Sequence, residues 1–181
     1  VVAAISAFNH PFNLAVHQVI PAIAVGCPVI IRPATQTPMS AIKLVEILKE
    51  AGLPNGWAQA VVCDRNAGEL LVTSPKTAFF TFIGSGPVGW YLNSKSSPGT
   101  RSALEHGGVA PVIVEPDADI EAMIPDLVKG GFYHAGQVCV SVQRIFVHES
   151  IANTVASKIA EKASKLVVGN QLDPKTEVGY M

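Results

Sequence analysis

Two residues in this sequence have the types and settings needed for covalent chemistry on a carbonyl group. Cys139 lies in YHAGQVCVS (133–141), directly after a Gly-Gln-Val run, and a cysteine thiolate is a strong nucleophile. Glu105 lies in ALEHGG (103–108), against two glycines that allow close backbone approach, and its carboxylate could be a general base. Taken singly, each has a simpler explanation: a small buried thiol for the cysteine and a solvated carboxylate for the glutamate.

A glycine cluster, GSGPVG (84–89), has the composition of a phosphate-binding turn. Gly84, Gly86 and Gly89 match the spacing G-x-G-x-x-G, and a strand, a glycine turn and a helix start together bind anions. That fingerprint normally occupies the first βαβ unit and has an acidic residue about 20 positions later. Here at least three strand-like runs precede it and Leu104 stands 20 positions on, so an ordinary tight turn explains the cluster equally well.

The elements that must position these residues alternate between strands and helices. Short apolar, β-branched or aromatic runs predict strands, and apolar residues at helical spacing predict helices. This alternation predicts an α/β fold with an open, mostly parallel Rossmann-like sheet, helices on both faces, and the start of a second α/β domain. Ligands bind such sheets at the carboxyl ends of strands, where Arg32 falls, although a surface arginine is also possible. We expect strands at 1–8, 28–33, 58–63, 78–84, 111–115 and 144–149, and helices at 38–52, 119–134 and 150–167.

Composition limits the classes of protein to consider. The chain is 49% hydrophobic and 15% charged, as expected of a sheet buried on both faces. A net charge of −1 gives no basic field for nucleic acid and no polybasic membrane anchor. The longest uncharged apolar run, residues 19–31, is too short to span a bilayer, and the histidines show no metal-ligand spacing. Three cysteines without a CxxC pair indicate a reducing, cytoplasmic compartment.

Four segments, in this order and over nearly the whole chain, resemble the aldehyde dehydrogenase superfamily. HPFNLAVHQVIPAIAVGCPVIIRPATQTP is similar to the family's P-[WF]-N and K-P-x-x-x-T-P block, and FTFIGSGPVG to its F-x-G-S-x-x-x-G turn. LEHGGVAP is similar to its glutamate signature and FYHAGQVC to its nucleophile signature. Glu105 and Cys139 stand 34 positions apart, as the general base and nucleophile of that family do.

The resemblance implies NAD(P)-dependent oxidation of a small-molecule aldehyde to a carboxylic acid. Cys139 would form a thiohemiacetal and then a thioester, which water activated by Glu105 would hydrolyse. The Asn13 amide and the Cys139 backbone N–H would stabilise the oxyanion. The implied cofactor-binding residues are Phe12, Arg32, Thr35, Gly84, Ser85, Gly89 and His106. Residues 1–107 would be part of the cofactor-binding domain, and residues 108–181, which contain the nucleophile, part of the catalytic domain.

The sequence also departs from the family pattern. Arg32 replaces the usual lysine, and Thr35 replaces a glutamate common in NAD-preferring members, so we expect NADP to be accepted. His106 stands where leucine is usual. By this resemblance the chain would lack family segments on both sides, so we expect a fragment that is inactive alone, from a homo-oligomeric protein. Alternatives are an acylating or semialdehyde-specific dehydrogenase, a non-catalytic nucleotide-binding protein, or a cysteine hydrolase pairing Cys139 with His134.

Overall fold

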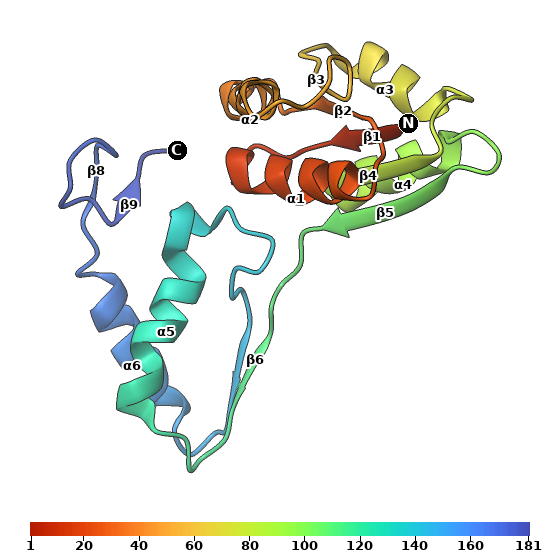
Figure 1. The fold of residues 1–181 in the computed structure, drawn as a ribbon. Coiled ribbons are helices and arrows are strands. Elements are labelled where there is room, and N and C mark those ends of the chain that lie inside the picture. The colour runs from red at the N-terminus through yellow and green to blue at the C-terminus, as the bar shows by residue number, and fades with distance from the viewer. The chain divides into compact units, whose positions relative to one another are not determined.

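A computed structural model describes residues 1–181, which divide into two compact units, Val1–His106 and Gly107–Met181 (Figure 1). The division falls beside the Gly107-Gly108 pair. Each unit is an α/β arrangement with parallel strands, which confirms the predicted fold class.

The first unit is a parallel sheet of five strands in the order β3-β2-β1-β4-β5. The chain adds β2 and β3 on one side of β1 and then β4 and β5 on the other side, so the strand order reverses between β1 and β4. The elements are β1 (Val2–Ile5), α1 (Pro11–Ala24), β2 (Val29–Arg32), α2 (Met39–Glu50), β3 (Ala58–Ala60), α3 (Arg65–Thr73), β4 (Phe79–Gly84), α4 (Gly86–Lys95) and β5 (Arg101–His106).

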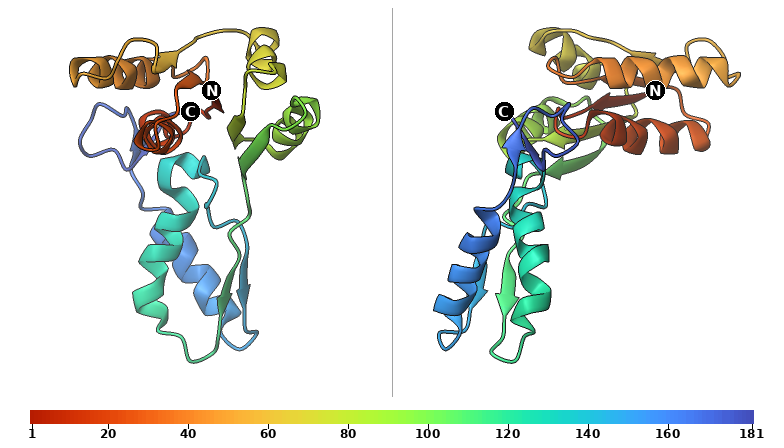
Figure 2. Two further views of the ribbon diagram at one scale, coloured as in Figure 1. Left: turned by 45° about the vertical axis from the view of Figure 1, so that its right-hand side comes forward. Right: turned by 90° about the vertical axis from the view of Figure 1, so that its left-hand side faces the viewer.

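Alternate residues of β1 point to opposite faces of this sheet, and helices cover the apolar side chains on both faces. Val2 and Ala4 pack with the buried residues of α1 and α2, whereas Ala3 and Ile5 pack with those of α3 and α4. Figure 2 shows the two helix pairs on opposite sides of the strands. The side chain of the buried Gln18 on α1 donates hydrogen bonds to the carbonyls of Ile5 and Thr81, each at 3.2 Å.

The second unit pairs β6 (Val112–Val114) with β7 (Ile145–Val147) in parallel and packs them with two helices. These helices are α5 (Ile120–Phe132) and α6 (Ala152–Ala163), which meet through Ile124, Val128 and Val155. The 3₁₀ turn η1 (Tyr133–Gly136) follows α5, and the two-residue strands β8 (Val168–Gly169) and β9 (Val178–Gly179) complete the unit.

Several elements are shorter than the sequence predicts. The strand expected at 1–8 ends at Ile5, and the helix expected at 119–134 ends at Phe132. In the first case the apolar run continues past the last residue that pairs with β2 and β4, because Ala7 and Phe8 belong to the loop before α1. In the second, His134 and Ala135 adopt positive φ angles, which a right-handed helix does not allow.

Candidate functional site

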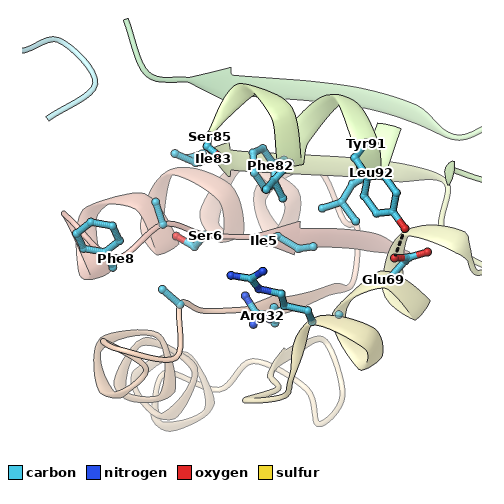
Figure 3. A pocket seen from close by; sticks show the side chains of 16 residues that line it. Ile5, Ser6, Phe8, Arg32, Glu69, Phe82, Ile83, Ser85, Tyr91 and Leu92 are labelled. Atoms are coloured by element: carbon cyan, nitrogen blue, oxygen red, sulfur yellow. Dashed lines mark hydrogen bonds between the residues drawn. The ribbon is translucent and has the colours of Figure 1, made fainter. Parts of the chain in front are cut away.

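A cavity of about 460 Å³ lies at the carboxyl ends of the central strands of the first unit (Figure 3). Ile5 of β1, Arg32 of β2 and Gly84 of β4 line it, together with residues of α3 and α4. This position, next to the point where the strand order reverses, is where open α/β sheets bind their ligands. The cavity is therefore the first candidate site of the molecule.

Arg32 is the principal charged group that β2 contributes to this cavity, and Figure 3 shows its side chain extending into it. Its Nη2 donates a hydrogen bond to the Cys63 carbonyl at 3.1 Å, whereas its Nε is buried and has no partner. Gly68 of α3 packs closely on it, since a Cβ at position 68 would lie 3.2 Å from the Arg32 Nε and Cδ. A second arginine, Arg65, lines the same cavity. These groups suit an anionic ligand.

The turn between β4 and α4 supplies a second set of donors at the cavity. Gly84 and Ser85 line it, and Ser85 is the N-cap residue of α4 without making a side-chain cap hydrogen bond. The first backbone N–H groups of a helix have no partner within the helix and carry its positive dipole end. This arrangement can bind a phosphate group.

Tyr91 and Glu69 form a hydrogen-bonded pair on the wall of the cavity that α3 and α4 share. The Tyr91 hydroxyl donates to Glu69 Oε2 at 3.0 Å (Figure 3). This hydrogen bond, and next the negative charge of Glu69, raises the pKa of Tyr91 above its ordinary value. The pair keeps the Glu69 carboxylate engaged on the side of the cavity that also carries Arg65.

Gly89 and His106 do not line the cavity; they pack against each other next to the turn between β4 and α4. A Cβ at position 89 would collide with His106 Nε2 and would come within 2.9 Å of the Phe82 ring. The His106 ring also lies edge-on to Phe82 and to Trp90, with centroids 6.1 and 5.7 Å away. Gly89 thus has the role of the third glycine of the fingerprint, which permits close helix–strand packing.

Phe12, Asn13 and Thr35 also lie outside the cavity lining. Phe12 and Asn13 are exposed at the start of α1, and the exposed Thr35 donates its hydroxyl hydrogen bond to Gln36 Oε1 at 3.3 Å. Whether they bind a cofactor or substrate stays a prediction.

The loop between β1 and α1 contains two residues that the sequence reasoning missed. Phe8 lines the cavity, and the side-chain oxygen of Asn9 is buried. The pair Phe-Asn occurs twice in the sequence, at 8–9 and at 12–13. The first pair follows the apolar run of β1. Its position at the carboxyl end of a strand, where α/β sheets bind ligands, could have identified Phe8 and Asn9 as candidate site residues.

Cys139 occupies the second position of a turn in the second unit. The Ser141 N–H donates to the Val138 carbonyl at 3.0 Å and closes the turn, and the Gly108 N–H donates to the Cys139 carbonyl at 3.1 Å. The side chain of Cys139 is exposed, and its backbone N–H makes no hydrogen bond in the structure. This is an accessible sulfur next to a backbone donor, as nucleophilic attack with oxyanion stabilisation requires.

The approach to this turn is a run of residues with left-handed backbone conformation. His134, Ala135 and Gly136 have φ angles of 54°, 55° and 74°. Residues other than glycine adopt this region at a cost of roughly 1–2 kcal/mol each. Strained backbone of this kind clusters at functional sites, where the surrounding structure holds it in place.

The other predicted residues have less distinctive settings. Glu105 is exposed near the end of β5, opposite Ile83 of β4, and it belongs to the first unit whereas Cys139 belongs to the second. Cys27 and Cys63 are free and half-buried. No group of three or more His, Cys, Asp or Glu residues is placed to hold a metal ion. None of the helices combines the length and apolar character needed to cross a bilayer.

Comparison with known proteins identifies relatives over the full chain. The model of the "Aldehyde dehydrogenase family" matches residues 1–181. A 3-sulfolactaldehyde dehydrogenase from Priestia aryabhattai is 45% identical over 100% of this chain, which spans 38% of that protein.

Two solved structures share the fold over nearly all of the chain. The crystal structure of an aldehyde dehydrogenase from Brucella melitensis biovar abortus 2308 is 36% identical, with a TM-score of 0.95 over 99% of this chain and 38% of that one. A betaine aldehyde dehydrogenase from Staphylococcus aureus in complex with NAD+ is 30% identical, with a TM-score of 0.95 over 98% and 36%.

Proposed function

Because this chain belongs to the aldehyde dehydrogenase family, we propose that the complete protein oxidises an aldehyde to a carboxylic acid with NAD or NADP. The observation that carries the proposal is the exposed Cys139 thiol at the turn of residues 138–141, beside its own unengaged backbone N–H. The chain spans 38% of the Priestia aryabhattai relative, so the activity belongs to the whole protein. We expect residues 1–181 alone to show little or no turnover.

The reaction would begin with attack of the Cys139 thiolate on the aldehyde carbon. A C–S bond forms, and the π electrons of the carbonyl move to its oxygen, where the Cys139 N–H and the predicted Asn13 amide would stabilise the charge. A nicotinamide, when bound, would accept the hydride that the oxyanion expels as its C=O bond re-forms, which would leave a thioester on Cys139. Glu105 would then take a proton from water as the water attacks the thioester, which breaks the C–S bond and releases the acid.

The cavity of the first unit fits the phosphates and the adenosine end of a dinucleotide. The turn at Gly84 and Ser85 would hold phosphate oxygens, and the unpaired Arg32 Nε would gain an acceptor. Arg65 adds a second positive charge to the cavity, where the Glu69 carboxylate opposes it, and Thr35, outside the cavity lining, adds no further carboxylate to repel a 2′-phosphate. We therefore propose that NADP is accepted as well as NAD.

Comparison of the dissociation constants of NAD and NADP tests this proposal. An Arg65→Gln variant should weaken NADP more than NAD, because only NADP carries the additional phosphate. NAD binding more than about tenfold tighter than NADP, equivalent to about 1.4 kcal/mol, would contradict the proposal.

The side-chain oxyanion donor has two candidates, Asn13 from the sequence and Asn9 from the structure. Asn9 lies in the loop at the carboxyl end of β1, next to the cavity residue Phe8, whereas Asn13 is exposed on α1. Removal of a true donor lowers kcat about 10²- to 10³-fold. Asn9→Ala and Asn13→Ala variants of the complete protein, assayed for kcat and for cofactor affinity, identify which amide acts.

Selective alkylation tests the central role of Cys139. Iodoacetamide should label Cys139 faster than Cys27 and Cys63, and an aldehyde should protect it, with peptide mass spectrometry as the readout. Cys27 and Cys63 are internal controls because both are free and half-buried. Equal labelling rates without protection would favour a non-catalytic nucleotide-binding protein.

An acylating or a semialdehyde-specific dehydrogenase remains the alternative within the family. Acylating members transfer the acyl group to coenzyme A, and they commonly lack the glutamate found here at position 105. Product analysis with water or coenzyme A as the acceptor identifies an acylating enzyme, and a comparison of aldehydes with and without a carboxylate identifies a semialdehyde-specific one. A homo-oligomeric assembly and a cytoplasmic location are part of the proposal, and light scattering of the complete protein and its fluorescent fusion in cells test them.

A further inference from the structure

A second cavity, of about 250 Å³, lies beside the turn that carries Cys139. Val138 and Val140, the two chain neighbours of Cys139, line it, although Cys139 itself does not. Ser141 and two charged residues of α5, Asp126 and Lys129, also line it. A molecule held in this cavity would lie next to the nucleophile. Its volume is below the range of about 300–1,000 Å³ typical of ligand pockets, so a small molecule fits best.

Ser141 gives this cavity an unsatisfied hydrogen-bonding group. Its side chain is 2% exposed, and its hydroxyl is buried without a hydrogen-bond partner. Its backbone N–H is already used in closing the turn at 3.0 Å from the Val138 carbonyl. A buried hydroxyl without a partner is unfavourable, and a ligand oxygen would accept a hydrogen bond from it.

Lys129 gives the cavity an uncommitted positive charge. It is exposed in the last turn of α5, and the ion pairs of the structure involve three other lysines. Asp126 lies one helical turn earlier and forms no ion pair with Lys129. A ligand that carries an anionic group can therefore pair with the Lys129 ammonium, while Asp126 weakens that attraction.

We propose that this cavity selects aldehydes that carry an anionic group, with Lys129 and Ser141 as its binding residues. The proposal rests on aldehyde oxidation at Cys139 and names the substrate class of that reaction. The anionic end would lie against the Lys129 ammonium and the Ser141 hydroxyl, and the valines beside Cys139 would contact the carbon chain.

The test compares succinic semialdehyde with butanal, two four-carbon aldehydes that differ in a terminal carboxylate, on the complete protein. Wild type should have the higher kcat/KM for succinic semialdehyde. Lys129→Met should lower the ratio of the two kcat/KM values about 10- to 100-fold, the range for a lost charge-assisted hydrogen bond. Ser141→Ala should lower it less, and Asp126→Asn should raise it, because that variant removes the opposing charge.

Lys162→Met is the matched control, because Lys162 is likewise exposed in the last turn of its helix, α6, and does not line this cavity. It should leave the ratio unchanged. A wild-type preference for butanal, an unchanged ratio in Lys129→Met, or an equal loss in Lys162→Met would each overturn the proposal.

A second measurement separates this proposal from the proposed catalytic activity. Succinate should slow alkylation of Cys139 by iodoacetamide in the wild type and lose this effect in Lys129→Met. Such protection in a protein that oxidises neither aldehyde would support the anion site and reject the oxidation. Oxidation of both aldehydes without protection by succinate would reject the anion site alone.

Discussion

Replacement of Gly89 by alanine tests how tightly α4 is held against the sheet. The new methyl group would collide with His106 Nε2 and approach the Phe82 Cδ1 and Cε1 atoms to 2.9 and 3.0 Å. Overpacking of this kind costs about 1–3 kcal/mol. Alanine is favoured over glycine inside a helix by about 0.5–1 kcal/mol. We therefore expect Gly89→Ala to lower the free energy of unfolding by up to about 2 kcal/mol.

Gly86→Ala is the matched control, because it makes the same change in the same helix beside the same ring. A Cβ at position 86 would lie 3.8 Å from His106 Nδ1, which is ordinary van der Waals contact. Residue 86 precedes Pro87, which disfavours helical backbone for a residue with a Cβ, so Gly86→Ala should be neutral or mildly destabilising and Gly89→Ala should lose more stability. A second substitution, His106→Ala, should recover part of the loss in the Gly89→Ala background, since the Phe82 contact remains.

Urea unfolding of residues 1–181, followed by tryptophan fluorescence, measures these differences. The only tryptophans, Trp57 and Trp90, both belong to the first unit, so the signal reports on the unit that contains α4. Equal midpoints for the Gly89→Ala and Gly86→Ala variants would refute the close packing described here. An unchanged Gly89→Ala midpoint after addition of His106→Ala would instead assign the clash to Phe82 alone.

Three further predictions concern the first unit. Glu69→Gln should lower the raised pKa of Tyr91 toward its ordinary value, as measured by tyrosinate absorbance, and an unaltered titration would contradict this prediction. The contact between Tyr91 and Glu69 stabilises the fold at neutral pH, and this stabilisation is lost as the pH rises through the raised pKa of Tyr91. Asp64→Ala should destabilise the unit by about 1 kcal/mol in urea, because Asp64 caps α3 by accepting the Ala67 N–H at 2.8 Å, whereas Asp64→Asn should retain most of the stability. Gln18→Leu should destabilise it by about 1–3 kcal/mol, since it removes a buried donor to two carbonyls; a variant as stable as wild type would show that these hydrogen bonds contribute nothing net.

The fold of the first unit follows from local patterns in the sequence. Apolar runs separated by helical periods predict its parallel strands, and the strand expected at 28–33 corresponds to β2, Val29–Arg32. Strand ends were less predictable: Ala7 and Phe8 are apolar but lie in a loop, because pairing with the neighbouring strands stops at Ile5. Pairing between distant segments determines such boundaries, and local composition does not encode it.

The candidate sites were only partly predictable for the same reason. Motif spacing pointed to Cys139, Gly84 and Ser85. The contact of Gly89 with His106 and the unpaired hydroxyl of Ser141 arise from packing between separate elements, so no single stretch of sequence reveals them.

The hydrogen bonds around Cys139 have a consequence for how new specificities could arise. Main-chain groups alone close the turn and attach it to Gly108, so the location of the sulfur does not depend on which side chains flank it. Val138 and Val140 can therefore be exchanged for larger, smaller or polar residues while the reactive atom stays where it is. Evolution, or a laboratory library randomised at these two sites, could change the preferred substrate without rebuilding the catalytic apparatus.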